Sequence, residues 1–180
     1  VGSEMCIRDR VDMAAPWEAM VVIGGVRGTL TGSESDRAGQ YRRFVESVHR
    51  YASYARTLNV SLAVEPINRY ETNIVPTIGQ AMDVVDEVGL DNVGVLADTF
   101  HMNIEEVDLA AALRSAGDRL LHVQFTDSNR LPAGQGHIDF QALSEALRVI
   151  EYEGYLSAET LPEPDSYTAA RSALEYYATL

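Results

Sequence analysis

Short apolar runs alternate with longer amphipathic stretches from about residue 20 to the last residue of this chain. The first run, residues 20–25, is rich in β-branched residues and ends in glycine, which is typical of a strand that leads into a turn. Residues 36–58 then place Tyr41, Phe44 and Val48 on one helical face. The pattern predicts a strand followed by a helix.

The same unit recurs four more times. Thr77 is placed to cap the second helix, and Gly89 and Gly117 are placed to end the second and third. The predicted strand and helix pairs are 61–65 with 77–88, 93–98 with 108–116, 120–125 with 139–150, and 155–159 with 166–180. Strands that alternate with helices pair in parallel, because each strand needs a crossover helix to return to the same edge. The predicted fold class is α/β.

Two α/β architectures fit this alternation, an open doubly wound sheet and a closed barrel. The nearest thing to a glycine-rich phosphate turn is residues 24–28, which lack the spacing and the acidic partner of a dinucleotide site. The barrel is therefore favoured. A complete (β/α)₈ TIM barrel has eight units in about 250 residues. We expect a partial (β/α)₈ TIM barrel of about five C-terminal βα units, with the first three missing.

The chain divides into a short leader and one domain. Residues 1–10 (VGSEMCIRDR) fit neither a strand nor an amphipathic helix, so we expect them to be a non-native leader. No linker or low-complexity segment interrupts the rest of the chain. Residues 11–180 are expected to form the C-terminal part of a single TIM-barrel domain.

Charge and cysteine content exclude several functions. A formal charge of −13 repels phosphate backbones and anionic lipid, so we expect neither nucleic acid nor a membrane as partner. All 14 basic residues are arginine, which excludes a Schiff-base lysine from this stretch. Cys6 is the only cysteine, so an internal disulfide or a Cys-rich zinc site is excluded. A reducing cytoplasm is the expected location, and no apolar run approaches the roughly twenty residues of a spanning helix.

Polar residues occur at the carboxyl ends of four successive predicted strands. These residues are Glu65, Asp98, Gln124 and Glu159. A single acidic residue after a strand is more often a helix cap or a surface residue. Four polar residues at the same end of four successive strands are harder to explain as caps or surface residues. The carboxyl ends of barrel strands converge on the face where active sites form.

Convergence of three carboxylates and an amide oxygen predicts a divalent cation between them. Without a cation the carboxylates would repel one another and lose solvation. An all-oxygen set suits Mn²⁺ or Mg²⁺ better than zinc, with Co²⁺ as a further candidate.

Three motifs carry a resemblance to a known family. They are residues 65–71 (EPINRYE), 98–106 (DTFHMNIEE) and 127–130 (DSNR). They resemble the motifs of the ketose 3-epimerase group, which includes the D-tagatose and D-psicose epimerases, in the xylose-isomerase-like TIM barrel superfamily. The likeness runs from about residue 20 to residue 159.

The resemblance implies roles for seven residues. The implied metal ligands are Glu65, Asp98, Gln124 and Glu159, and the implied substrate-binding residues are Glu71, His101 and Arg130. Gln124 departs from the family, which has histidine there. A glutamine oxygen can still bind Mg²⁺ or Mn²⁺, and 3-dehydroshikimate dehydratases on the same barrel resemble this arrangement.

Three further positions have weaker interpretations. His122 lies two residues before Gln124 on the same strand face and is an alternative ligand. Arg27, after the first strand, is a weaker candidate for holding substrate. The acidic pair Glu105 and Glu106 is expected to be a solvated helix start.

We predict a metal-dependent isomerase or epimerase of a ketose-type sugar or sugar phosphate. Proton transfer next to a carbonyl would use Glu65 and Glu159 as the catalytic pair. The alternative is a dehydratase of a cyclic polyhydroxy substrate, of the inosose or 3-dehydroshikimate type. An apurinic endonuclease is disfavoured by the negative charge. A non-enzyme alternative is an inactive barrel fragment or an interaction module. We expect the partner to be a small sugar and the full-length form to be a homo-oligomer.

Overall fold

The computed structural model describes the backbone of residues 2–180 and the side chains of residues 6–180. The strands are β1 (Val21–Ile23), β2 (Leu62–Val64), β3 (Val93–Asp98), β4 (Leu120–Gln124) and β5 (Leu156–Ser157). The α-helices are α1 (Gly2–Ala14), α2 (Glu34–Arg56), α3 (Ile78–Val88), α4 (Thr99–Glu105), α5 (Leu109–Ala116), α6 (Phe140–Val149) and α7 (Ser166–Tyr177). Short 3₁₀ turns are η1 (Ala15–Trp17), η2 (Gly25–Arg27) and η3 (Gly117–Arg119). None of the helices in this described part has both the length and the apolar character of a membrane span.

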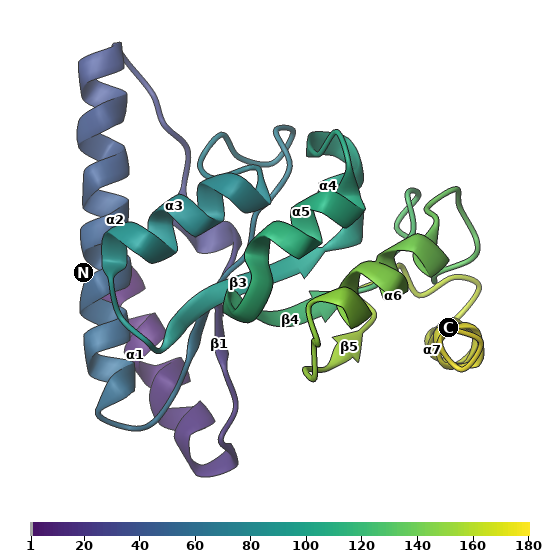
Figure 1. Cartoon of the computed structure of the whole chain (residues 1–180). Coiled ribbons are helices and arrows are strands. Elements are labelled where there is room, and N and C mark those ends of the chain that lie inside the picture. The colour runs from purple at the N-terminus through teal and green to yellow at the C-terminus, as the bar shows by residue number, and fades with distance from the viewer. Residues whose placement is uncertain (1) are drawn as a thin grey trace.

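The sheet follows the order of the sequence. Its strand order is β1-β2-β3-β4-β5, and every neighbouring pair is parallel. In a doubly wound sheet the strand order reverses at a switch point, whereas in a barrel wall it runs on in one direction. Helices α2, α3, α5 and α6 contact one another in succession on one side of the sheet (Figure 1). The predicted partial (β/α)₈ barrel of five units is confirmed.

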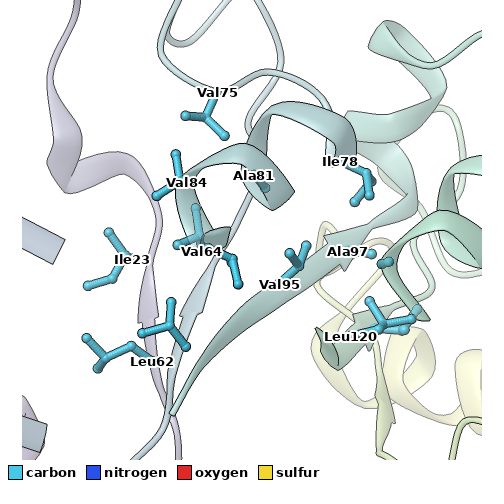
Figure 2. Close-up of a cluster of buried hydrophobic side chains, with 14 of the residues drawn as sticks. Ile23, Leu62, Val64, Val75, Ile78, Ala81, Val84, Val95, Ala97 and Leu120 are labelled. Atoms are coloured by element: carbon cyan, nitrogen blue, oxygen red, sulfur yellow. The ribbon is translucent and has the colours of Figure 1, made fainter. Parts of the chain in front are cut away.

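The hydrophobic core lies between the sheet and its helices. Successive residues of a strand point to opposite faces, so Leu62 and Val64 of β2, two residues apart, lie on the same face. Figure 2 shows them grouped with Ile23, Val95 and apolar side chains of α3. Each of these side chains is buried. These apolar contacts hold β1, β2 and β3 against the helices. The other face of each strand therefore points toward the barrel interior.

The interior face carries apolar residues along the strands and polar residues at their ends. Ala63, Gly94 and Leu96 belong to this face by alternation. A register shift between Val95 and Leu96 accommodates one extra residue of β4. Gly94 makes this possible, because a Cβ there would lie 2.6 Å from Cγ of Leu121 and against the backbone oxygen of Arg119.

The N-terminal segment differs from the expectation. Helix α1 contacts α2 and β1, and Ile7 and Val11 belong to the core, with Val11 fully buried. Residues 1–10 fit neither a strand nor an amphipathic helix by pattern, yet residues 2–10 lie in helix α1, because two apolar residues four apart are enough to pack one side of a helix. Val1 lies outside the described residues. A non-native origin of this segment stays a prediction.

We predict opposite effects of adding one methyl group at two glycines. Gly94→Ala should lower the free energy of unfolding by about 1–3 kcal/mol, because the methyl group overlaps backbone and side chain of the next strand. Gly79→Ala, in α3 with open space around its Cβ position, should raise it by up to about 1 kcal/mol. Urea denaturation measures both. Equal effects at the two positions would contradict the close approach at Gly94.

Candidate active site

The four predicted strand-end residues lie on consecutive strands. Glu65 directly follows β2, Asp98 and Gln124 end β3 and β4, and Glu159 lies two residues beyond β5. Asp98 pairs in register with Gln124, which pairs with Ser157. Register partners on neighbouring strands point to the same face, so Asp98 and Gln124 both face the barrel interior.

Glu65, Asp98 and His101 form a compact group. One ligand atom from each lies within 4.8 Å of the others, and all three residues are buried. Glu159, which the sequence predicted as a further ligand, is not part of this three-residue group. Two buried oxygens at the site, Oδ2 of Asp98 and Oε1 of Gln124, have no hydrogen-bond partner. Buried acceptors normally have a donor, so these two oxygens mark a place where a cation or a ligand donor fits.

The surroundings of Glu65 and Asp98 disfavour the charged form of both carboxylates. Burial raises the pKa of Glu65 to about 7, and the charge of Glu159 adds to the rise while Arg27 and Arg130 oppose it. Burial also raises the pKa of Asp98 to about 7, against the hydrogen bond from Phe100, and the charge of Glu65 adds to that rise. A positive charge placed between the two carboxylates would lower both pKa values.

Asp98 has two separate tasks because its two oxygens face different partners. Oδ1 accepts a hydrogen bond from the backbone nitrogen of Phe100 at 2.8 Å and caps α4. Helix α4 then brings His101 back over the strand end, with Nε2 at 3.8 Å from Oδ2 of Asp98. Burial lowers the pKa of the His101 ring to about 4, so the imidazole is neutral near pH 7. Helix α4 was not predicted from the sequence, although it carries His101 to the strand ends.

The loop after β2 supplies a second set of groups. Asn68 is buried, and its Nδ2 lies 2.7 Å from Nδ1 of His101 and 3.2 Å from Oε1 of Glu71. The Glu71 side chain is 54% exposed, and its Oε1 lies 3.9 Å from Nδ1 of His101. The predicted substrate-binding residues Glu71 and His101 are thus brought together. Sequence reasoning missed Asn68, although it stands inside the 65–71 motif.

Arg130 and Glu159 lie in the segments after β4 and β5 and contact each other. Nη2 of Arg130 lies 3.5 Å from Oε1 of Glu159, and the guanidinium stacks over the Phe100 ring at 4.7 Å. The backbone of Arg130 has a positive φ of 62°. Asp127, fully buried, holds this loop by accepting backbone hydrogen bonds from Ser128, Gly134 and Ile138. Asp127 opens the 127–130 motif, but the sequence alone predicted no role for it.

Three positions with weaker sequence-based interpretations have definite partners in the structure. The guanidinium of Arg27 donates to the backbone oxygens of Ile23, Gly24, Glu65 and Ile74, so it joins strand ends and is not free to hold a substrate. Nε2 of His122 is 2.7 Å from Oγ of Ser157 and is engaged there. The expectation of a solvated Glu105–Glu106 helix start is wrong. Glu105 ends α4 and pairs with Arg69 at 2.7 Å, and Glu106 accepts from the Ile78 nitrogen.

Comparison with known proteins agrees with this geometry. The family model described as Xylose isomerase-like TIM barrel matches residues 6–179. The chain belongs to this family. A D-psicose 3-epimerase of Enterocloster bolteae is 42% identical over 120 residues, which are 67% of this chain and 40% of that protein. A 3-dehydro-D-guloside 4-epimerase of Escherichia coli K12 is 39% identical over 126 residues, which are 69% of this chain and 48% of that protein.

A solved structure extends the likeness over nearly the whole chain. The crystal structure of 3-keto-D-glucoside 4-epimerase from E. coli superposes with a TM-score of 0.89 at 29% identity, covering 98% of this chain and 70% of that one. The segment shared with each of the two curated relatives spans less than half of that relative's length. The names of these relatives describe epimerases of sugars, and the resemblance to the ketose 3-epimerase group is confirmed.

The buried carboxylates predict how stability changes with pH when divalent cations are chelated. The unfolded chain releases the protons of Glu65 and Asp98 near pH 4, whereas the folded chain holds them until about pH 7. The folded state therefore binds more protons in this window, and its stability falls as pH rises through it. We expect the free energy of unfolding to drop by more than about 1 kcal/mol between pH 5 and pH 8.

Urea denaturation at the two pH values measures this drop. Asp98→Asn should make it smaller, and the same change at the exposed Asp118 should leave it as in the unaltered chain. A drop that is unaffected by Asp98→Asn would contradict the assignment.

Proposed function

We propose that the protein containing this chain is a metal-dependent epimerase of a ketose-type sugar, acting by proton transfer next to a carbonyl. The observation that carries the proposal is that two glutamates, Glu65 after β2 and Glu159 after β5, lie at the same edge of the sheet as two buried oxygens without partners at the ends of β3 and β4. The effect of the Glu159 charge on the pKa of Glu65 supports a common site. The names of the relatives support a sugar as substrate.

The residues at the strand ends fit a divalent cation. Asp98 and Gln124 would each offer an oxygen that otherwise lacks a partner, and Glu65 and Glu159 would complete an oxygen set. Glu159 would have to turn from Arg130 to reach it. Mg²⁺ or Mn²⁺ suits oxygen ligands at roughly 2.0–2.5 Å. Such a cation would polarise the substrate carbonyl as a Lewis acid.

The chain's own residues would bind the sugar and move its proton. Burial raises the pKa of Glu65 to about 7, and a bound cation would lower it again. With the cation bound, Glu65 would be charged near neutral pH and able to accept a proton as a general base. One glutamate would take the proton from the carbon next to the carbonyl as the electron pair moves toward the carbonyl oxygen. The other would return a proton to the opposite face of that carbon, which inverts its configuration. His101, Glu71 and Arg130 would hold the neighbouring hydroxyl groups.

Replacement of Glu159 tests the two-glutamate scheme. In the whole protein, Glu159→Gln should keep substrate binding but lower the exchange of the carbon-bound hydrogen with deuterated water by at least about 10²-fold, because the carboxamide cannot accept that proton. NMR in deuterated water measures the exchange. Glu163→Gln, an exposed carboxylate in the same loop, is the matched control and should exchange at the unaltered rate.

Exchange at the unaltered rate in Glu159→Gln would show that Glu159 is not a base. Release of water from the sugar in place of an epimer would instead indicate a dehydratase.

Replacement of Gln124 tests the metal. Gln124→Met keeps the side-chain volume but removes the oxygen, so it should weaken Mn²⁺ binding by about 10- to 100-fold. Titration of the chelated protein with Mn²⁺, followed by calorimetry, gives the affinity. Gln135→Met, the same change at an exposed loop position, should leave the affinity unchanged. Equal affinity in both variants would remove Gln124 from the ligand set.

A further inference from the structure

His101 is the one residue of the compact group whose chemical role is ambiguous. Its distance to Glu65 and Asp98 permits it to be a metal ligand, and its position beside Glu71 permits it to be a hydrogen-bond donor to substrate. A neutral imidazole carries one proton, either on Nδ1 or on Nε2, and only the nitrogen without the proton can bind a cation. The location of that proton therefore decides between the two roles.

The surroundings of Asn68 fix which way its side-chain amide points. Its Oδ1 accepts a hydrogen bond from the backbone nitrogen of Tyr70 at 3.0 Å. Its Nδ2 faces Oε1 of Glu71 at 3.2 Å. Rotating the amide by 180° would set Nδ2 against the Tyr70 N–H and Oδ1 against a carboxylate oxygen, so both contacts would become repulsive. Nδ2 therefore points toward His101.

Within hydrogen-bond distance, Nδ1 of His101 faces two donors, both from Asn68, whereas Oε1 of Glu71 lies beyond that distance at 3.9 Å. Nδ2 of Asn68 lies 2.7 Å away, and the backbone nitrogen of Asn68 donates at 3.4 Å. A proton on Nδ1 would point at both N–H groups and be repelled by them. Neither side chain can move away, because Asn68 and His101 are buried, with 2% and 3% of their surface exposed. Nδ1 is thus the acceptor.

We propose that Asn68 is a positioning residue that fixes His101 in the neutral tautomer with its proton on Nε2. Nε2–H then points toward Oδ2 of Asp98 from 3.8 Å, a separation too long for a direct hydrogen bond. His101 is a donor across this gap and is not a cation ligand. A substrate oxygen as the acceptor in the gap rests on the proposed function, whereas the tautomer itself rests only on the contacts of Asn68.

Nitrogen NMR of the whole protein with ¹⁵N-labelled histidine tests the tautomer directly. The signals of His101 are identified by their loss in His101→Gln. With divalent ions chelated, Nδ1 should give the chemical shift of an unprotonated ring nitrogen and Nε2 that of a protonated one. Addition of Mg²⁺ should leave this pattern unchanged. The reverse pattern, or loss of the Nε2 proton on adding Mg²⁺, would overturn the proposal without any variant.

Two variants separate a tautomer effect from a general disturbance of the loop. Asn68→Asp replaces the donor with an acceptor and should move the proton of His101 to Nδ1. Asn73→Asp makes the same chemical change in the same loop, where the side chain contacts the backbone of Leu30, and should leave His101 unaltered. A shift of the His101 pattern in both variants, or in neither, would contradict the role of Asn68.

Activity measurements test the consequence for the reaction. In the whole protein, Asn68→Asp should lower kcat by about 10- to 100-fold, the usual loss when the partner that orients a site histidine is replaced. Asn73→Asp should change kcat by less than about 2-fold. The NMR experiment contains no sugar, so its result does not depend on whether the protein is an epimerase. An unaltered kcat in Asn68→Asp with a reversed tautomer would remove the donor role of His101 from the reaction.

Discussion

Burial of two carboxylates, Glu65 and Asp98, at the ends of neighbouring parallel strands is the constraint on which the rest of the site depends. Charged groups out of water are costly unless opposite charge or hydrogen bonds compensate. Here the compensation is incomplete. Asp98 uses one oxygen to cap α4 and leaves the other without a partner, and the charge of Glu65 is balanced only through Arg27 and Arg130. The site is therefore built for a positive charge or a polar ligand.

The loops around these carboxylates are held by side chains that bind backbone. Arg27 joins the ends of β1 and β2 through carbonyl oxygens. Asp127 accepts three backbone hydrogen bonds and so fixes the loop that presents Arg130. Glu105 accepts from both the backbone and the guanidinium of Arg69 at the end of α4. Loops fixed in this way can hold catalytic groups with little motion, which favours pre-organised chemistry.

The position of Glu159 depends on the balance of charge at the site. Arg130 lies between Glu159 and the Phe100 ring and contacts both. Glu159 contacts Arg130 and is not part of the group formed by Glu65, Asp98 and His101. A cation bound at the strand ends would compete with Arg130 for Glu159, so under the proposed function cation binding and the position of Glu159 would be coupled through one ion pair. The pair is partly exposed, so this competition is between interactions of modest strength.

The sequence by itself determined the five strand–helix units, the parallel sheet and the four strand-end residues, because the period of apolar positions and the capping residues are local signals. It also placed Glu65, Asp98 and Gln124 on one face, since the period of two in a strand is fixed by backbone geometry. Helices α1 and α4 were not predicted from the sequence, because each has a weak apolar pattern and depends on the elements that it packs against.

Only the tertiary structure decided which side chains meet. Asn68 and His101 are 33 residues apart, and Arg130 and Glu159 come from different strand ends. Neither contact has a local pattern, because both depend on how loops fold over the strand ends. The tautomer of His101 depends on the same long-range contacts, since the proton goes to whichever ring nitrogen is not already facing a donor.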